Sequence, residues 1–313
     1  VIHVQITRAE AMTDAITKYI LAPVAGGPLP VWTAGAHLDV VVAPEYLRQY
    51  SMCGDPANRA FYEIAVLREA EGRGGSALLH RIFAEGRKIF VSHPINHFPL
   101  AEDAPNTLLM GGGIGVTPML AMAHRLHALG RAFALHYSGR SRADMGFLTD
   151  LAAVPWADRV HLHISAEGSR ADLPTLLTSP PGTHVYTCGP DAYMQAVTRA
   201  ATRAGIPEDH RHLEFFTVPD LPEYENHPFT LRLASGQDIP VPADKTAADV
   251  LNENGIKVDV KCADGLCGVC KCGVTAGAVE HRDFVLSQSQ RRTSIILCQS
   301  RASEPGGVIE LDL

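Results

Sequence analysis

Four cysteines have the residue type and the spacing to bind iron. Cys262, Cys267 and Cys270 follow a C-x4-C-x2-C pattern, and Cys298 comes from a separate apolar segment. This is the spacing of plant-type 2Fe-2S ligands. Two tetrahedral irons need two thiolates each, and three of the four can come from one loop wrapped around the cluster. The cysteines therefore predict a 2Fe-2S cluster and a protein that moves electrons.

The residues around these cysteines support that interpretation. Gly265 and Gly268 allow a tight turn and let backbone N–H groups point at the sulfurs. The alternative is a zinc site, but zinc ribbons pair one C-x2-C with a second, and this region has a single one. Cys272 is expected to pack beneath the loop without binding metal, and Cys53 is expected in a hydrophobic core.

A glycine-rich segment has the composition of a nucleotide site. Residues 106–119 place an apolar strand before a turn and a helix start. Gly112 and Gly113 let the backbone approach a pyrophosphate, and Thr117 can donate its hydroxyl. Taken alone, the segment also fits a plain strand–helix turn. The segment Cys188-Gly189-Pro190 favours the nucleotide site, because it ends a later strand and is predicted at the same edge of the sheet.

Two further segments suit a phosphate and an aromatic ring. Arg48 and Tyr50 alternate on a predicted strand, so a guanidinium fork and a ring share one face. The segment 72–76, Gly-Arg-Gly-Gly-Ser, opens a helix and offers N–H groups to an anion. An edge-strand cation beside a buried tyrosine is the alternative for Arg48 and Tyr50. His161 with His163, and His210 with His212, alternate on strands but lack partners at ligand spacing, so no metal site is expected there.

The elements that must position these residues fall into three groups. The first ~100 residues are expected to form short strands in the runs VIHVQITRAE, HLDVVV, RQYSMCG, FYEIAVLRE and RKIFVSHP. With one helix, from Ser76 to Gly86, they indicate a small barrel or sandwich. From about residue 104, strands alternate with helices, which indicates a parallel sheet covered on both faces. A proline-rich acidic linker at 217–228 precedes a hairpin, a short helix, the cysteine loop and a final strand pair around SIILCQS and VIELDL. The predicted domains are 1–102, 103–218 and 229–313.

Composition excludes several classes of protein. Of 313 residues, 46% are hydrophobic and 19% are charged, which is ordinary for a globular chain, and the net charge of −7 argues against nucleic acid and anionic membrane as partners. We find no stretch near 20 apolar residues and no signal-peptide pattern in VIHVQITRAE. Clustered cysteines without an export signal favour metal binding in the cytoplasm.

Taken together and in this order, the segments resemble one family. The chain carries, in this order, the motifs R-x-Y-S, G-x-G-G-S, G-G-G-I-G-V-T-P-M and C-G-P and the C-terminal cysteine pattern. This series is similar to the phthalate dioxygenase reductase type of flavin iron-sulfur reductase, within the ferredoxin–NADP reductase superfamily. The resemblance covers nearly the whole chain. It implies a multidomain fold with an antiparallel β-barrel flavin domain, an α/β parallel-sheet nucleotide domain and an α+β (β-grasp) ferredoxin domain.

The resemblance also implies site residues. Contacts with the flavin are expected from Arg48, Tyr50, Ser51, the backbone of Ala65 and Val66, and the phosphate-binding Gly74, Gly75 and Ser76. The dinucleotide is expected at Gly112, Gly113, Thr117, Gly189 and Pro190. Ser51 near the flavin N5, Cys188 beside the nicotinamide, and Glu214 with Phe216 over the flavin ring are the expected catalytic positions.

The resemblance further implies the cofactors, the electron route and the partner. FMN is favoured over FAD, because nothing obvious remains to seat an adenosine. NADH is favoured, but Arg140 and Arg142 can accept a 2′-phosphate, so NADPH stays open. Electrons would pass from NADH to flavin to 2Fe-2S and then to the Rieske-type terminal oxygenase of an aromatic dioxygenase or O-demethylase system. The alternatives are a redox-sensing or electron-storing binding protein and a reductase that serves a separate ferredoxin.

Overall fold

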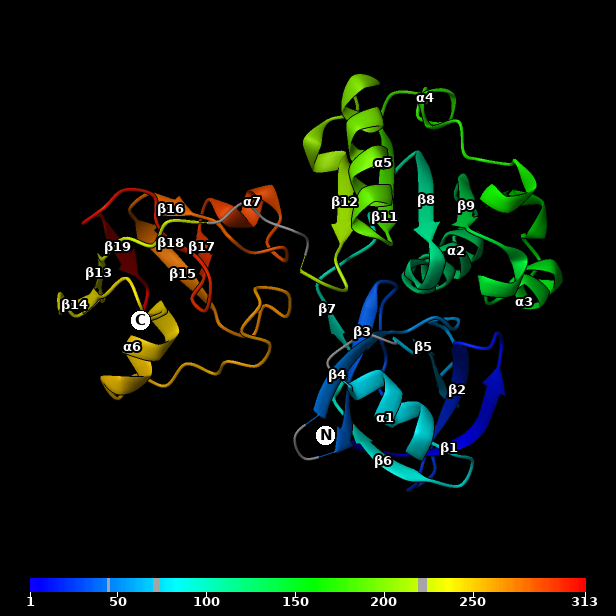
Figure 1. Cartoon of the computed structure of the whole chain (residues 1–313), viewed down its shortest axis with the longest axis horizontal. Helices are drawn as coiled ribbons and strands as arrows, with labels where there is room; N and C mark the ends of the chain where they lie inside the picture. Colours follow the sequence, from blue (N-terminus) through cyan, green and yellow to red (C-terminus); the bar gives the residue numbers. More distant parts are fainter. Residues whose placement is uncertain (44–45, 70–73, 219–223) are drawn as a thin grey trace. The chain divides into compact units, whose positions relative to one another are not determined.

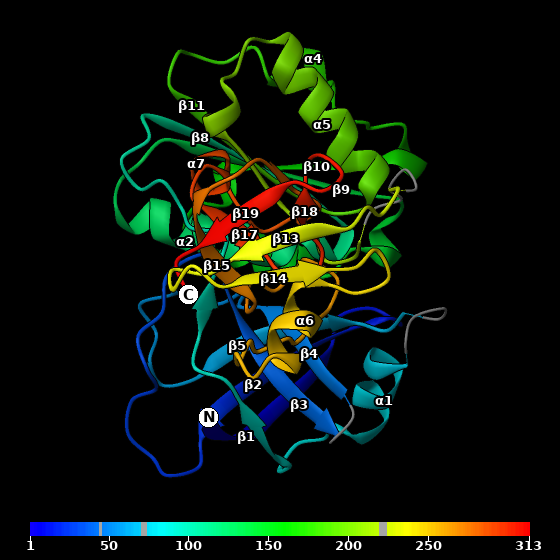
Figure 2. The ribbon, with the colours of Figure 1, turned by 90° about the vertical axis from the view of Figure 1, so that its left-hand side faces the viewer.

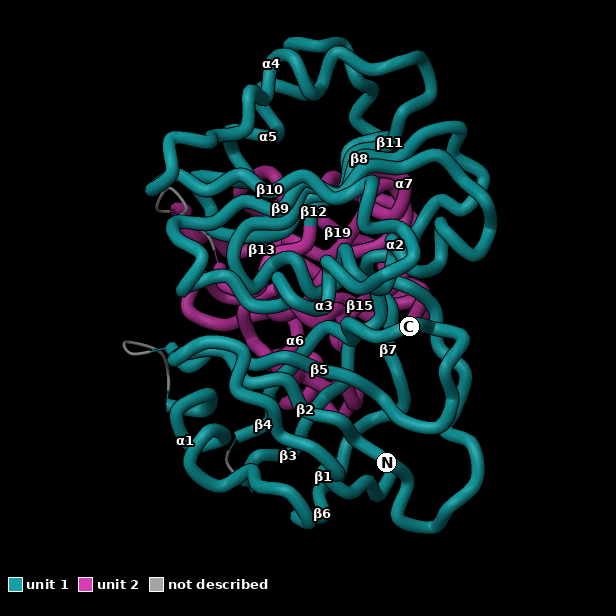
Figure 3. Tube along the Cα trace, turned by 90° about the vertical axis from the view of Figure 1, so that its right-hand side faces the viewer, with its two compact units in different colours: residues 1–213 teal, residues 214–313 magenta. Residues whose placement is uncertain are grey.

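The computed structural model describes residues 1–43, 46–69, 74–218 and 224–313. Contacts divide the chain into two compact units, Val1–Leu213 and Glu214–Leu313 (Figures 1 and 3). The first unit holds both the β-rich segment and the strand–helix segment, and the three predicted domain boundaries stay predictions. Within the described ranges, no helix is long and apolar enough to cross a membrane.

The β-rich segment forms an antiparallel barrel that is nearly closed. Its strands run in the order β4-β3-β6-β1-β2-β5, with β7 beside β3, and a bridge between Met52 and Ile64 joins the two ends of this path. The sequence analysis missed β2, which pairs with β1 and β5. The strands are β1 (Ile2–Ala11), β2 (Ile16–Pro23), β3 (Ala36–Ala43), β4 (Tyr46–Ser51), β5 (Tyr62–Leu67), β6 (Lys88–Val91) and β7 (Ile95–Asn96).

The helix of the barrel, α1 (Gly75–Ile82), is shorter than predicted. It ends before Phe83, whose backbone is extended, and Gly86 lies in the following turn. Its N-cap is Gly74, which has a φ of 78° that favours glycine. No side chain caps the helix start, so its first N–H groups have neither a side-chain cap nor an intrahelical partner. Gly72 and Arg73, part of the predicted phosphate segment, lie outside the described residues.

The strand–helix segment forms a parallel sheet in the order β10-β9-β8-β11-β12. The chain starts at the central strand β8, moves outward through β9 and β10, and then returns to the other side of β8 with β11. Such a reversal opens a crevice at the carboxyl ends of the two strands where it occurs, here β8 and β11. The strands are β8 (Asn106–Gly112), β9 (Phe133–Gly139), β10 (Val160–Ile164), β11 (Thr183–Cys188) and β12 (Arg211–Glu214).

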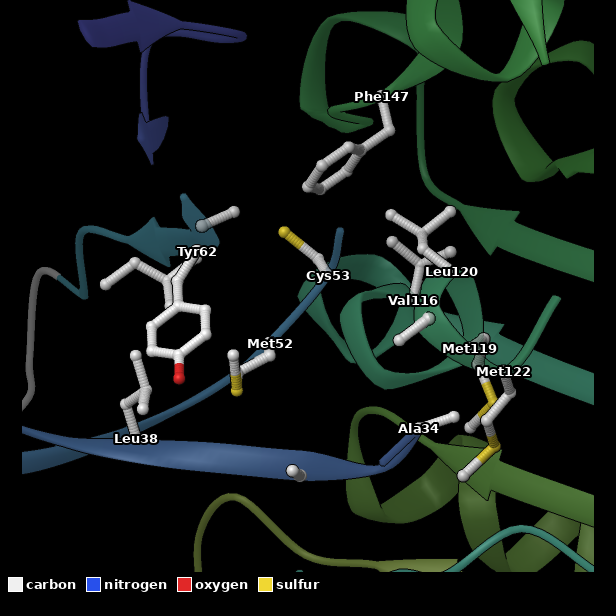
Figure 4. Close-up of a cluster of buried hydrophobic side chains, with 14 of the residues drawn as sticks. Ala34, Leu38, Met52, Cys53, Tyr62, Val116, Met119, Leu120, Met122 and Phe147 are labelled. Carbon is white, nitrogen blue, oxygen red and sulfur yellow. The ribbon is translucent and has the colours of Figure 1, made fainter. Parts of the chain in front are cut away.

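Helices cover both faces of this sheet, as predicted. Helices α2 (Thr117–Ala128) and α3 (Leu148–Ala153) pack on one face, and α4 (Leu173–Leu176) and α5 (Asp191–Arg203) pack on the other. The α2 face and the barrel share one continuous core. Figure 4 draws Met52 and Cys53 of the barrel together with Val116 and Leu120 as members of this one cluster of buried side chains. Cys53 is buried there, which confirms its predicted core position.

The second unit is a mixed sheet with a helix on one face. The strand order is β14-β13-β19-β15-β17, with β13 and β19 parallel (Figure 2). A small ribbon pairs β16 with β18 (Figure 1). The predicted final strand pair is wrong in detail, because β15 lies between β17 and β19. The elements are β13 (Phe229–Arg232), β14 (Asp238–Val241), α6 (Ala247–Glu253), β15 (Lys271–Ala276), β16 (Val279–Glu280), α7 (Gln288–Arg291), β17 (Ser294–Ile296), β18 (Arg301–Ala302) and β19 (Val308–Leu311).

Candidate functional site

The two predicted nucleotide segments meet at the crevice of the parallel sheet. The register pairs Cys188 of β11 with Gly111 of β8, so both segments leave the sheet at the same edge. A Cβ on Gly115 would lie 2.4 Å from the carbonyl oxygen of Cys188, and a Cβ on Gly189 would lie 2.9 Å from the Cα of Gly112. The two turns therefore pack backbone against backbone, which only glycine permits here.

The surroundings of this contact have the features expected of a pyrophosphate site. A Cβ on Gly113 would meet no atom within 4 Å, so space is open above the turn. Thr117 is buried and donates its hydroxyl to the Ile114 carbonyl at 2.9 Å, which ties the first turn of α2 to the glycine turn. Gly112 lies against Tyr193 of α5, and Pro190 is the N-cap of that helix. Tyr193 was missed by the sequence analysis.

On the barrel, Arg48 lies against the start of α1. A Cβ on Gly75 would come within 2.4 Å of the Arg48 Nε, so the absent side chain makes room for the guanidinium. The same guanidinium stands 5.1 Å from the Tyr46 ring and donates to the Leu47 carbonyl at 2.9 Å. Two segments far apart in the sequence thus bring a cation and free helix N–H groups together, as an anion site requires.

The other predicted flavin residues lie on strands β4 and β5 of the barrel. Tyr50 pairs with Leu38 and Arg48 with Val40, so both predicted side chains share one face of β4, and burial raises the pKa of Tyr50. Ser51 ends β4 and is buried. Ala65 and Val66 are buried on β5, and the His80 ring of α1 hydrogen-bonds to the Val66 carbonyl at 3.0 Å. His80 was also missed, because nothing in the sequence indicates that α1 bonds to β5.

Three further predicted residues occupy different surroundings. Ser76 accepts a hydrogen bond from the Glu69 N–H at 3.2 Å, so its hydroxyl helps to fix the start of α1. Glu214 is the last residue of β12, and the boundary between the two units falls just before it; Phe216 follows in the second unit and is exposed. Their expected position over the flavin ring stays a prediction.

The four cysteines of the predicted cluster converge in the second unit. The Cys262 thiol hydrogen-bonds to those of Cys267 and Cys298, and Cys270 bonds to Cys298, which lowers the pKa of Cys262 and raises that of Cys298. Cys262 is half-buried and the other three are buried. One thiol from the turn after β17 and three thiols from the cysteine loop therefore face one another, as ligands of a two-iron cluster must.

The backbone of the loop is shaped for anionic sulfur. N–H groups of Asp264 and Leu266 donate to Cys262, that of Val269 donates to Cys267, and that of Gly265 donates to Cys298. Such bonds favour the thiolate, which is the form that binds metal. Gly265 has a φ of 73°, and its carbonyl accepts from Phe284 N–H at 3.1 Å, so the loop is fixed from outside.

The donor set fits a binuclear cluster. Within the described ranges, no three His, Cys, Asp or Glu side chains converge in the way that a single metal ion requires. A 2Fe-2S cluster does not need such a group, because each iron takes two thiolates and two bridging sulfides. Cys272 lies outside the set. Its thiol donates to Asp312 Oδ1 at 3.6 Å, and burial raises its pKa to about 12.

The histidines noted in the sequence form two stacked clusters on the parallel sheet. His136 stacks on His161 and His163, with a 3.0 Å hydrogen bond between His136 and His163. A second cluster joins His184 with His210 and His212. Burial, and then the neighbouring rings, lower the pKa of His136 to about 4, and the same causes lower that of His212 to about 4.

These clusters predict loss of stability in mild acid. A folded pKa below the unfolded value of about 6.5 means that the unfolded chain binds more protons, so the stabilisation is complete above pH 6.5 and is lost as the pH falls toward 4. For His136 the loss is on the order of 2–3 kcal/mol. Urea unfolding at pH 5.0 and 7.5 measures it. His136→Gln should flatten the pH dependence, whereas substitution of the exposed His93 should not. An equally steep pH dependence in both variants would contradict this origin.

The fold and the sites together define a class of protein. A barrel with an anion site at its helix, a parallel sheet with a glycine crevice, and a β-grasp unit with four convergent thiols make a flavin- and nicotinamide-linked iron-sulfur reductase. The protein-family model for the 2Fe-2S iron-sulfur cluster binding domain matches residues 232–303 of this chain. The chain is 42% identical over 305 residues to the tert-butanol monooxygenase / tert-amyl alcohol desaturase reductase subunit of Aquincola tertiaricarbonis, covering 92% of this chain and 89% of that one.

Two more comparisons identify the family. Phthalate dioxygenase reductase of Burkholderia cepacia is 36% identical over 315 residues, which cover 99% of this chain and 97% of the relative. A solved phthalate dioxygenase reductase, described as a modular structure for electron transfer from pyridine nucleotides to 2Fe-2S, matches with a TM-score of 0.70 at 36% identity, over 99% of this chain and 97% of that chain. The chain belongs to the phthalate dioxygenase reductase family, which confirms the predicted fold and class.

The same architecture occurs inside a larger enzyme. An intact type IV self-sufficient cytochrome P450 monooxygenase matches with a TM-score of 0.90 at 38% identity. The match covers all of this chain and 41% of that one, so this chain spans about two fifths of the fused protein.

Proposed function

We propose that this chain is the NADH-dependent reductase component of a cytoplasmic oxygenase system. It passes electrons from NADH through FMN and a 2Fe-2S cluster to a Rieske-type terminal oxygenase, and dioxygenases and O-demethylases of aromatic compounds are the proposed class. The observation that carries the proposal is that one chain holds the glycine crevice, the barrel anion site and the four convergent thiols. The names of the relatives, which are reductases of oxygenase systems, support the partner.

Bound nicotinamide and flavin supply hydride chemistry, and the cluster supplies single-electron chemistry. The chain supplies binding and placement. Gly112, Gly113 and the start of α2 hold the pyrophosphate, and Cys188 ends the strand beside it. Cys262, Cys267, Cys270 and Cys298 hold the cluster in a largely buried loop.

FMN is the proposed flavin. Arg48 and the start of α1 make one compact anion site, which suits the terminal phosphate of FMN. Ser51, Tyr50 and the backbone of Ala65 and Val66 would then line the isoalloxazine. Glu214 and Phe216 are the proposed cover of the ring.

The visible spectrum, the iron content and the flavin released on heating test this proposal together. We expect overlapping flavin and iron-sulfur absorbance, two irons per chain and release of FMN. Released FAD would overturn the FMN assignment alone. A chain without iron, or without flavin, would overturn the electron route.

NADH preference is the finer part of the proposal. Arg142, one of two arginines considered for a 2′-phosphate, is held by Glu167 through two hydrogen bonds of 2.8 and 3.1 Å. Both charges are therefore satisfied, and a phosphate at Arg142 would face the Glu167 carboxylate. We infer that this pair disfavours NADPH.

Replacement of Glu167 with Gln should raise the kcat/KM for NADPH about tenfold, because a freed guanidinium gains a charged hydrogen bond. The kcat/KM for NADH should change less than twofold. Ferricyanide reduction with each nucleotide measures both. Adding Arg142→Ala to Glu167→Gln is the control and should abolish the gain. A gain that survives in the double variant would show that Arg142 does not bind the phosphate.

A further inference from the structure

The last residues of the predicted linker are bound to the body of the second unit. Arg282 follows β16 and Arg301 lies in β18, and both side chains are buried although they are charged, with 8% and 5% of their surface exposed. Glu280 of β16 pairs with Arg301 in the β16–β18 ribbon, which places both arginines at this ribbon. Segment 224–228 runs directly into β13.

Arg282 holds three consecutive linker residues. Its Nη1 donates to Asn226 Oδ1 at 2.6 Å, and its Nη2 donates to the Glu225 carbonyl at 3.2 Å. The guanidinium carbon lies 4.5 Å from the centre of the Tyr224 ring. The remaining Nε donates to Glu280 at 2.7 Å, so each nitrogen of the fork has a partner.

Arg301 holds the next residues. Its Nε and Nη2 both donate to the His227 carbonyl, at 3.2 and 2.9 Å. The guanidinium lies 4.9 Å from the Phe229 ring. The Pro228 carbonyl accepts from the Gly306 N–H at 2.8 Å. We call Arg282 and Arg301 the arginine clasp.

The acceptors of the clasp explain why two guanidinium groups can be buried side by side. A buried charge is costly unless hydrogen bonds offset the lost water, and here the linker supplies part of those bonds. Detaching segment 224–228 would leave both arginines short of acceptors. The clasp therefore holds this segment firmly.

The clasp is also next to the cluster loop. Arg282 N–H donates to Ser300 Oγ at 3.2 Å, two residues after the ligand Cys298. Phe284 N–H donates to the carbonyl of Gly265 in the loop, and the Phe284 ring lies 5.1 Å from that of Phe215, two residues before the linker. Segment 282–284 thus contacts the end of the linker, a residue just before its start, and the loop.

Binding of segment 224–228 shortens the connection between the units. When the Phe215–Phe284 ring contact opens, ten residues, 214–223, lie between Leu213 and the clasped segment, whereas fifteen, 214–228, would lie between Leu213 and β13 without the clasp. Effective concentration falls roughly as the −3/2 power of tether length, so this change alone is worth about twofold. Without the clasp the linker would also leave the second unit in no fixed direction, which would lower the effective concentration further.

We propose that the arginine clasp is a positioning device for electron transfer, which keeps the connection short and holds the cluster at high effective concentration for the flavin of the same chain. This proposal rests on the electron route proposed above. It assigns Arg282 and Arg301 a role that neither the cofactor motifs nor the cluster ligands provide.

The test uses the complete protein with its cofactors. Two variants are compared with the wild type. The double variant Tyr224→Ala/Asn226→Ala removes clasp contacts from the linker side, and Arg282→Lys keeps the charge but loses the planar guanidinium. After mixing with NADH without oxygen, stopped-flow absorbance should show an unchanged flavin phase and at least twofold slower reduction of the cluster. Limited proteolysis should cut residues 217–228 at least fivefold faster. Arg232→Ala, which removes an exposed arginine paired with Asp238 and Glu310, is the control and should change neither.

The outcomes separate the clasp from the function. Unchanged cluster reduction in both variants, with a normal wild-type trace, would overturn the positioning role. Unchanged proteolysis would overturn the clasp itself. A wild-type cluster that NADH does not reduce would overturn the electron route and the positioning role together. If Arg282→Lys fails to fold, the Tyr224→Ala/Asn226→Ala double variant still tests the positioning role, because it leaves the body of the unit intact.

Discussion

Replacing Cys267 with Ala should abolish NADH-dependent reduction of cytochrome c, by at least a hundredfold, while ferricyanide reduction stays within twofold of the wild type. Cys267 is buried among the other three ligands, and three thiolates leave one iron with an open position. Ferricyanide takes electrons from flavin directly, whereas cytochrome c is expected to take them from the cluster. Paired assays of the two acceptors, with iron content, make the measurement.

Cys272→Ala is the matched control for this prediction. Cys272 is another buried cysteine of the same unit, and its thiol bonds to Gly273 and Asp312. Its loss should leave the iron content and both activities near the wild-type values. Normal cytochrome c reduction in Cys267→Ala would mean that the cluster is not downstream of the flavin. Wild-type protein that takes up electrons but turns over neither acceptor would favour an electron-storing protein.

Gly115→Ala should reduce NADH-dependent ferricyanide reduction at least a hundredfold. The new Cβ would lie 2.4 Å from the carbonyl carbon and oxygen of Cys188 and 2.6 Å from the Gly189 nitrogen. These are backbone atoms, so the two turns of the crevice must move apart. A displacement of about 1 Å at a binding site can cost a hundredfold in rate. The kcat/KM for NADH measures the loss.

Two observations keep this prediction specific to the crevice. Reduction of flavin and cluster by dithionite should be normal in Gly115→Ala, because this reductant does not have to bind at the turn. Gly146→Ala adds the same methyl group to the same unit with contacts of 3.4 Å or longer, and it should behave as wild type. Equal losses in the two variants would indicate general destabilisation of the unit instead of a damaged nucleotide site.

Much of the architecture was predictable because local patterns carry it. The cysteine spacing, the glycine turn and the alternation of strand and helix each depend on residues that are near one another in the sequence. Strand β2 was missed although it lies inside the barrel sheet. Helix α1 was drawn four residues too long, because Gly86 looks like a helix stop while the chain is already extended at Phe83.

The residues that were missed share one physical reason. His80 bonds to a carbonyl of β5, Tyr193 packs on Gly112, and Arg282 binds a linker more than 50 residues before it. None of these partners is set by local spacing. They depend on register and packing, which bring distant segments together only after folding.

The sequence by itself determined the kind of chemistry and the order of its parts, since thiol spacing and glycine turns are local requirements of the cofactors. Only the tertiary structure decided how those parts close on each other: Gly115 against Cys188, Arg48 against Gly75, and two buried arginines against the linker. Contacts of this kind depend on which backbones can approach and which buried charges find acceptors. Those conditions belong to the folded chain and have no counterpart in the spacing of residues along it.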